Sequence, residues 1–115
     1  ELASILRKTS GIADVLAEAL VSLEQQIGFA VVFGSVASGK ARADSDIDLL
    51  IVGRVSFSEI VKAIYPAQQQ LRREINPKLY LPDEWKLALT ERSVFIRELL
   101  EQPVIKIIGD MDDLG

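Results

Sequence analysis

The sequence predicts an α/β protein with a small mixed β-sheet and helices packed against it. Two short, largely apolar runs rich in β-branched residues, 29–33 ("FAVVF") and 47–52 ("IDLLIV"), are typical of strands that are covered on both faces. Longer segments before and after them repeat apolar residues at helical spacing. With 115 residues, of which 49% are hydrophobic and 26% charged, the chain has the composition of one globular domain with a single core.

The predicted helices follow from apolar spacing and from residues that cap or break a helix. Between residues 12 and 25 apolar side chains recur every three or four positions, and Gly28 is expected to end this helix. Residues 56–73 form a second predicted helix, with Ser56 or Ser58 as its cap. The proline within this segment marks a break or kink.

The second half of the chain predicts one more strand, further helices and a closing strand. Residues 73–81 ("REINPKLYL") alternate apolar and polar side chains, which places Glu74 on the polar face of a third strand. Pro82 suits a first helical position, and helix is expected from there to about Gln102, in one or two pieces. Residues 104–109 ("VIKIIG") then close the fold as a short strand.

We expect one domain over residues 1–115, with leading helices in 1–28, a motif-bearing core in 29–81, and C-terminal helices with a short strand in 82–115. The chain opens on Glu1 without an initiator methionine, which suggests a fragment of a longer protein. Because no apolar run is long enough to cross a bilayer and no signal peptide is visible, a cytoplasmic location without membrane contact is expected.

Composition also limits the chemistry that the chain can perform. Cysteine and histidine are both absent, which excludes disulfides, thiolate and histidine metal sites, and catalytic triads that use histidine. Catalysis therefore depends on carboxylates, hydroxyls, Lys, Arg and bound metal. The net charge of −4 argues against a broad basic surface for non-specific nucleic-acid binding.

The glycine-rich stretch "GSVASGKA" (34–41) comes within one residue of a phosphate-binding P-loop. A P-loop ends in Ser or Thr, but this chain has Ala41, and the six residues "ARADSD" before the next strand are too few for a helical crossover. The alternative is that Gly34 and Ser35 end the first strand and direct backbone N–H groups and a hydroxyl toward an anion. An ordinary strand-ending turn would have the same sequence.

Asp46 and Asp48 lie two positions apart at the start of the second strand, so their side chains leave the same face of the sheet. Two carboxylates held together repel each other unless a cation lies between them, and Mg²⁺ is the cation that oxygen ligands and substrate phosphates suit. Glu74 on the third strand is the candidate for a third carboxylate. The alternatives are a turn rich in side-chain hydrogen bonds for "ADSD" and an ordinary surface position for Glu74.

The stretches "GSVASGKARADSDIDLLIV" and "REINPKLY" together resemble the DNA polymerase beta-like nucleotidyltransferase superfamily, in particular its minimal nucleotidyltransferase members. The resemblance implies the nucleotidyltransferase fold, a small mixed sheet with helices packed against it. The metal ligands and catalytic residues that it implies are Asp46, Asp48 and Glu74. The nucleotide-binding residues that it implies are Gly34, Ser35, Lys40 and Ser45.

The same resemblance implies a metal-dependent enzyme that uses Mg²⁺ or Mn²⁺. It would transfer a nucleoside monophosphate from a nucleoside triphosphate, with ATP as the expected substrate, to a hydroxyl of a protein, a nucleic-acid end or a small molecule. The alternative is a non-catalytic nucleotide-sensing or partner-binding domain. Such a domain would belong to a winged-helix transcriptional regulator or act as the antitoxin of a helical HEPN toxin.

Overall fold

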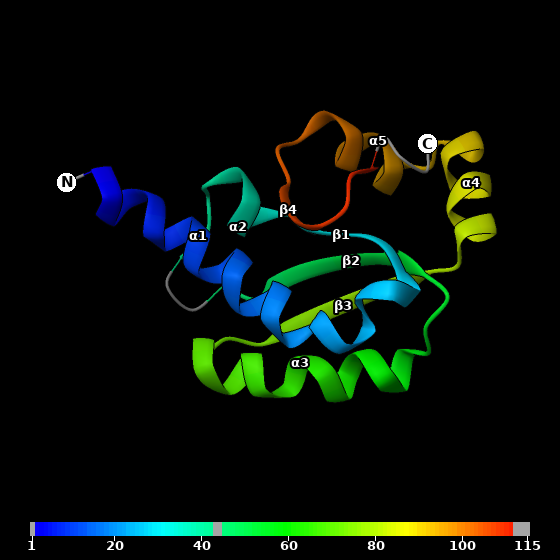
Figure 1. Ribbon diagram of the computed structural model, residues 1–115. Helices are drawn as coiled ribbons and strands as arrows, with labels where there is room; N and C mark the ends of the chain where they lie inside the picture. Colours follow the sequence, from blue (N-terminus) through cyan, green and yellow to red (C-terminus); the bar gives the residue numbers. More distant parts are fainter. Residues whose placement is uncertain (1, 43–44, 112–115) are drawn as a thin grey trace.

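The computed structural model describes residues 2–42 and 45–111, with residues 2–10 as backbone only. Its elements in chain order are α1 (Leu2–Ala19), the 3₁₀ helix η1 (Val21–Gln26), β1 (Ile27–Phe33), α2 (Ser35–Ser38), β2 (Ile47–Gly53), α3 (Phe57–Leu71), β3 (Ile75–Tyr80), α4 (Pro82–Glu91), α5 (Val94–Glu101) and β4 (Ile105–Ile108). The four strands form one sheet in the order β3-β2-β1-β4 (Figure 1). β1 is antiparallel to β2 and β4, whereas β2 and β3 are parallel, so the predicted mixed sheet is confirmed.

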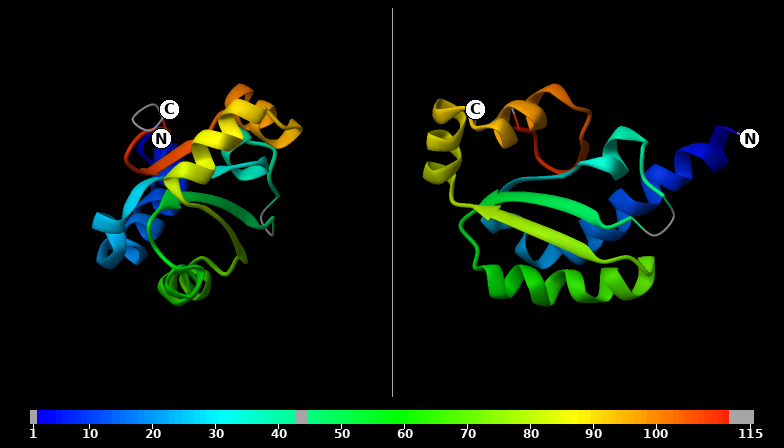
Figure 2. Two further views of the ribbon diagram at one scale, coloured as in Figure 1. Left: turned by 90° about the vertical axis from the view of Figure 1, so that its right-hand side faces the viewer. Right: turned by 180° about the vertical axis from the view of Figure 1, so that it is seen from behind.

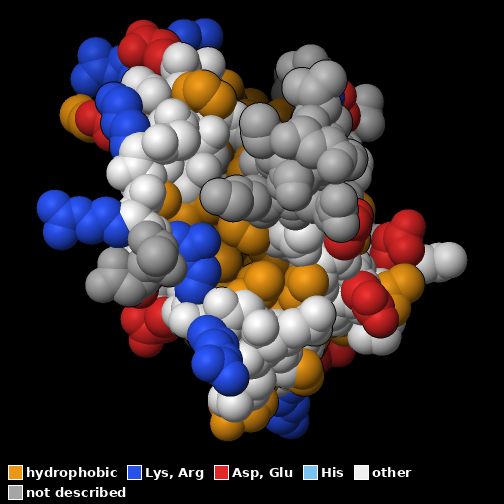
Figure 3. Space-filling model, turned by 90° about the vertical axis from the view of Figure 1, so that its left-hand side faces the viewer, with side chains coloured by type: hydrophobic (Ala, Val, Ile, Leu, Met, Phe, Trp, Pro, Cys, Tyr) orange, Lys and Arg blue, Asp and Glu red, His pale blue; other side chains and the backbone are white. Residues whose placement is uncertain are grey.

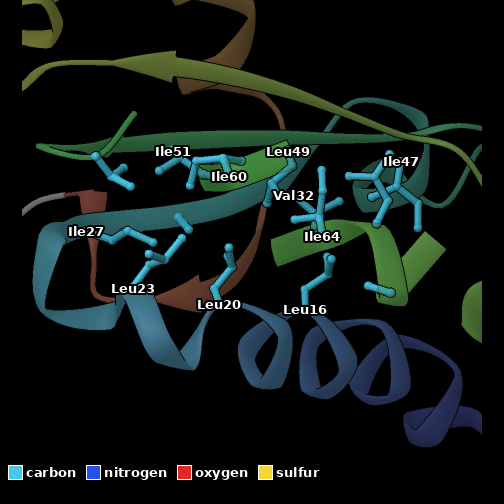
Figure 4. Close-up of a cluster of buried hydrophobic side chains, with 14 residues drawn as sticks. Leu16, Leu20, Leu23, Ile27, Val32, Ile47, Leu49, Ile51, Ile60 and Ile64 are labelled. Carbon is cyan, nitrogen blue, oxygen red and sulfur yellow. The ribbon is translucent and has the colours of Figure 1, made fainter. Parts of the chain in front are cut away.

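Helices cover both faces of the sheet. α1 and α3 pack on one face, where Leu16, Ile60 and Ile64 meet apolar residues of β1 and β2 (Figure 4). α4 and α5 lie on the other side from α3 (Figure 2), and their buried residues Trp85 and Ile96 belong to a second apolar cluster. This arrangement of layers explains why β1 and, after Asp48, β2 carry apolar side chains on both faces.

The alternation along β2 decides which face carries the candidate site. Ile47, Leu49 and Ile51 point into the cluster under α1 and α3. Leu50 points into the opposite cluster, under α4 and α5. Because side chains alternate along a strand, Asp48 shares the face of Leu50, on the α4 and α5 side of the sheet.

The first helix and the first strand differ from their predicted bounds. α1 begins at Leu2 and ends at Ala19, η1 fills the segment to Gln26, and Gly28 lies inside β1 rather than at a helix end. Ile27 pairs with Gly53 and Phe29 with the adjacent Val52, so Gly28 is the extra residue of a β-bulge. A glycine in a strand commonly marks such a bulge, and the local sequence does not distinguish it from a helix terminator.

The third helix confirms one of the two predicted caps and corrects the expected break. Ser56 caps α3 and forms a capping box with Glu59, while Ser58 lies in the first turn. The helix continues through Pro66 to Leu71. Pro66 is exposed, so the carbonyl that loses its helical hydrogen bond can turn toward water instead. Among the described helices, none has the length and apolar character that crossing a bilayer requires.

Candidate functional site

The candidate site lies where β1 ends and β2 begins. Phe33, the last residue of β1, pairs with Asp48 in β2. The next residue, Gly34, has φ 78° and ψ −153°, a backbone conformation that is essentially restricted to glycine. A β-carbon added at Gly34 would lie 2.5 Å from Oδ2 of Asp48. The Asp48 carboxylate therefore occupies the space that any larger residue at position 34 would need.

The glycine-rich stretch forms a single helical turn, α2, that starts at Ser35. It ends at Ser38, and the next residue, Gly39, caps it: the backbone N–H of Gly39 donates to the carbonyl of Ser35, and the N–H of Lys40 donates to the same carbonyl at 3.0 Å. The helix of a P-loop begins at its lysine, whereas Lys40 follows the end of α2, so the P-loop interpretation stays excluded. The side chains of Ser35 and Lys40 are both exposed at this turn.

The loop before β2 is held by an arginine that the sequence did not indicate. Ser45 accepts a hydrogen bond at its Oγ from the backbone N–H of Arg42 (2.7 Å), so its hydroxyl closes this loop. Arg73, which follows the end of α3, donates from Nε to the carbonyl of Ser45 (2.9 Å) and from Nη2 to that of Arg42 (2.7 Å). These bonds fix the chain just before Asp46, although the residues involved lie far apart in sequence. The intervening Asp44 lies outside the described residues.

The two predicted aspartates are brought together with Asn76, which was not among the candidate residues. Asp48 pairs with Asn76 across the parallel strands β2 and β3, and Nδ2 of Asn76 donates to Oδ2 of Asp46 at 3.3 Å. Partial burial raises the pKa of Asp48, a side-chain hydrogen bond between Asn76 and Asp48 itself lowers it, and the nearby charge of Asp46 raises it further, with a net upward shift.

Glu74 lies one residue before β3, and its side chain is exposed. Its backbone carbonyl accepts from the N–H of Ile47 at 2.8 Å, so Glu74 takes part in joining β2 to β3. Within residues 2–42 and 45–111, no three acidic, histidine or cysteine side chains gather closely enough to hold a metal ion together. The site that the described residues assemble thus has two carboxylates and the amide of Asn76.

This donor set fits one divalent cation of the Mg²⁺ or Mn²⁺ type. Both ions prefer oxygen ligands, and Mg²⁺ is commonly held by one or two carboxylates together with substrate phosphates. The absence of a side chain at Gly34 leaves the backbone of the turn directly against the Asp48 carboxylate. A phosphate group bound at this turn would therefore lie beside a cation held by Asp46 and Asp48.

Aromatic residues border the site on the side of α5. Phe95 packs against Phe33 with ring centroids 5.4 Å apart, and Nζ of Lys78 lies 3.9 Å from the centroid of the Phe95 ring. A cavity of about 160 Å³ opens beside Gly34, and its remaining lining residues are Glu98, Leu99 and Gln102 with the two phenylalanines.

Figure 3 shows the molecule from the end of the sheet where β2 begins. In this view Lys and Arg side chains lie along the left and lower margins of the surface.

The chain is similar to one known protein family. The sequence profile of the family described as "Nucleotidyltransferase domain" matches residues 13–109. The chain belongs to this family. The predicted resemblance is thereby confirmed, and the family is one of transferases. No curated protein matches the chain significantly.

Two solved structures share the fold of this nucleotidyltransferase domain. One is described as a toxin–antitoxin with AMP-PNP; it is 13% identical, with a TM-score of 0.61 over 89% of this chain and 77% of that chain. The other is a mutant of the toxin–antitoxin MntA–HpeT with two aspartate-to-glutamate substitutions; it is 12% identical, with a TM-score of 0.61 over 88% of this chain and 76% of that chain. The predicted nucleotidyltransferase fold is thereby confirmed.

Proposed function

We propose that the domain transfers a nucleoside monophosphate from a nucleoside triphosphate to an acceptor hydroxyl. The observation that carries this proposal is the close packing of the Gly34 turn against Asp48, with Asp46 beside it. In the reaction, the acceptor oxygen forms a bond to the α-phosphorus while the bond from that phosphorus to the bridging oxygen breaks. Pyrophosphate leaves with the electron pair, and the hydroxyl proton passes to solvent.

Asp46 and Asp48 would hold a divalent cation, which neutralises charge on the phosphate oxygens when bound. The backbone N–H groups after Gly34 and the hydroxyl of Ser35 would bind the phosphate tail. Lys40 adds positive charge in the exposed loop after α2. We leave Glu74 out of this ligand set because it precedes β3 and joins no acidic cluster among the described residues.

Two further groups fit the remaining parts of a nucleotide. Lys78 projects from β3 on the same face as Asn76, and its ammonium group rests on the Phe95 ring without an acidic partner among the described residues. It can therefore pair with phosphate. The cavity beside Gly34 is smaller than the roughly 300 Å³ typical of pockets for drug-sized ligands, which suits a planar base rather than a whole nucleotide.

The test is incubation with each α-labelled nucleoside triphosphate and Mg²⁺, with ATP expected to be the substrate. Release of pyrophosphate, or transfer of the label to an acceptor, is expected from the wild-type protein. Asp46→Asn should abolish both, because one of the two carboxylates that hold the cation loses its charge. Equal turnover by the mutant would exclude Asp46 as a ligand, and no turnover with any acceptor class would contradict the proposed reaction.

Partner binding is the second candidate function, and the outer face of α3 favours it. Phe57, Val61 and Tyr65 lie four residues apart along this helix and are 52%, 43% and 58% exposed. Both solved structures described above are toxin–antitoxin proteins. If the domain is an antitoxin, a HEPN-type protein encoded beside it should co-purify with the wild type. Phe57→Ser together with Tyr65→Ser should then reduce co-purification without changing nucleotide binding.

A further inference from the structure

Asn76 contacts the carboxylate pair from the neighbouring strand. The register of β2 and β3 places it opposite Asp48, and its amide donates to Asp46 at 3.3 Å. The amide nitrogen carries two N–H donors and no formal charge. Asn76 therefore offers the carboxylates of Asp46 and Asp48 an uncharged hydrogen-bond donor from the neighbouring strand.

The charge of this site favours one bound cation over two. Asp46 and Asp48 together supply two negative charges, enough to balance one divalent cation. The triphosphate oxygens can neutralise a cation that they themselves ligate, but a second divalent cation on the acceptor side of the aspartates would repel the first unless another anionic side chain joined the site. Among the described residues no third acidic side chain joins Asp46 and Asp48. Asn76 occupies the position on β3 from which an acidic side chain would contact both aspartates.

We propose that Asn76 limits this site to a single divalent cation for each bound nucleoside triphosphate. The inference rests on the proposed function, because it concerns the same carboxylates and the same nucleotide. Asp46 and Asp48 hold the cation, and the Asn76 amide orients Asp46 rather than attracting a second ion. An acceptor hydroxyl then loses its proton without a cation of its own, so Asn76→Asp should raise the rate of transfer while it changes the metal count.

The experiment counts Mn²⁺ and nucleotide that stay with the protein during gel filtration, using a triphosphate analogue that cannot be cleaved. The wild type should retain one Mn²⁺ for each nucleotide. Asn76→Asp adds a third carboxylate at the position level with Asp48 and should retain two. Gln69→Glu is the matched control, because it adds the same charge on an exposed position of α3, and it should retain one.

A second measurement follows the folded state without any activity. Three carboxylates without metal repel one another, so Asn76→Asp should melt at a lower temperature than the wild type and gain more from added Mn²⁺. Two Mn²⁺ per nucleotide in the wild type, or one Mn²⁺ per nucleotide in a folded Asn76→Asp variant, would overturn this inference but not the proposed function. If the wild type retained neither metal nor nucleotide, the proposed function would fail together with it. The wild-type count decides the matter even if the variant does not fold.

Discussion

The backbone of Gly34 and the carboxylate of Asp48 are packed so closely that a β-carbon at position 34 would lie 2.5 Å from Oδ2 of Asp48. Gly34 also has a backbone conformation that other residues avoid. Gly34→Ala should therefore lower the free energy of unfolding by about 1–3 kcal/mol, the usual cost of such backbone strain. It should also displace the Asp48 side chain and weaken binding of Mg²⁺ with nucleotide, as calorimetry would measure.

Gly39 provides the control for this substitution. It has φ 80° and ψ 11°, and an added β-carbon there would meet nothing within 4 Å. Gly39→Ala should cost about 1 kcal/mol through left-handed strain alone and leave nucleotide binding unchanged. Equal effects of the two substitutions on nucleotide affinity would mean that contact with Asp48 is not the reason for glycine at position 34.

Local patterns in the sequence were enough to predict the parts of the site that depend on one strand or one turn. The apolar runs located β1 and β2, and the spacing of Asp46 and Asp48 predicted that their carboxylates lie near each other, although Asp46 precedes β2 by one residue. The glycine-serine pair was correctly expected at the end of β1. Each of these features depends on residues that are neighbours in the chain, where alternation and turn chemistry act directly.

The features that the sequence did not predict depend on contacts between distant segments. The alternation in 73–81 put Glu74 and Asn76 on the same polar face, but only the parallel register of β3 against β2 sets Asn76 level with Asp48. Likewise, Arg73 holds the loop at Ser45 across 28 positions of sequence, and no local pattern indicates such a bond. The bulge at Gly28 also appears only when β1 is paired with β2.

The cap of α3 gives a prediction on stability that is independent of the site. Oγ of Ser56 accepts from the backbone N–H of Glu59 at 3.1 Å, and Glu59 accepts from the backbone N–H of Ser56 at 3.3 Å. Ser56→Ala should therefore lower the free energy of unfolding by about 1 kcal/mol in urea denaturation. Ser58→Ala, on the exposed first turn, should stay within about 0.5 kcal/mol of the wild type. A larger loss from Ser58→Ala would show that the cap is assigned to the wrong serine.

The raised pKa of Asp48 predicts how stability changes with pH. Burial, the largest cause, places the pKa of the folded state above the ordinary value of 3.8, so the folded protein holds this proton more tightly than the unfolded chain. The contribution of Asp48 to stability is then highest below the ordinary value and is lost as pH rises through the raised one. The Asp48→Asn variant does not lose this stability as pH rises, because the asparagine side chain does not ionise.

Urea denaturation of both proteins from about pH 3 to pH 7 measures this difference. The free energy of unfolding of Asp48→Asn, relative to the wild type, should rise with pH across the window above 3.8 and then stay level. A relative stability that falls with pH would mean that hydrogen bonding to the ionised carboxylate outweighs its burial. Binding of Mg²⁺ by the wild type should weaken over the same window as pH falls, because the proton and the cation compete for Asp48.

The substitution Asp46→Asn distinguishes between two interpretations of Asp46, a metal ligand and a residue of an ordinary turn. The negative charge of Asp46 is one of the causes that raise the pKa of Asp48, so the two carboxylates repel each other without metal. Removing the charge at the exposed Asp46 should raise the melting temperature slightly, by the equivalent of about 0.5 kcal/mol, the scale of exposed charge pairs. The same variant should lose most of the stabilisation that Mg²⁺ with nucleotide gives the wild type.

A turn without metal gives the opposite pair of results for Asp46→Asn. If the Asp46 carboxylate serves only to accept the 3.3 Å hydrogen bond from Asn76, the substitution keeps an acceptor oxygen but weakens a charge-assisted bond. The variant would then melt at or below the wild-type temperature, and added Mg²⁺ with nucleotide would shift both proteins equally. Thermal melts of the two proteins, each with and without ligand, give four curves that distinguish the cases. Lower stability without ligand, together with an unchanged response to ligand, would remove Asp46 from the metal site.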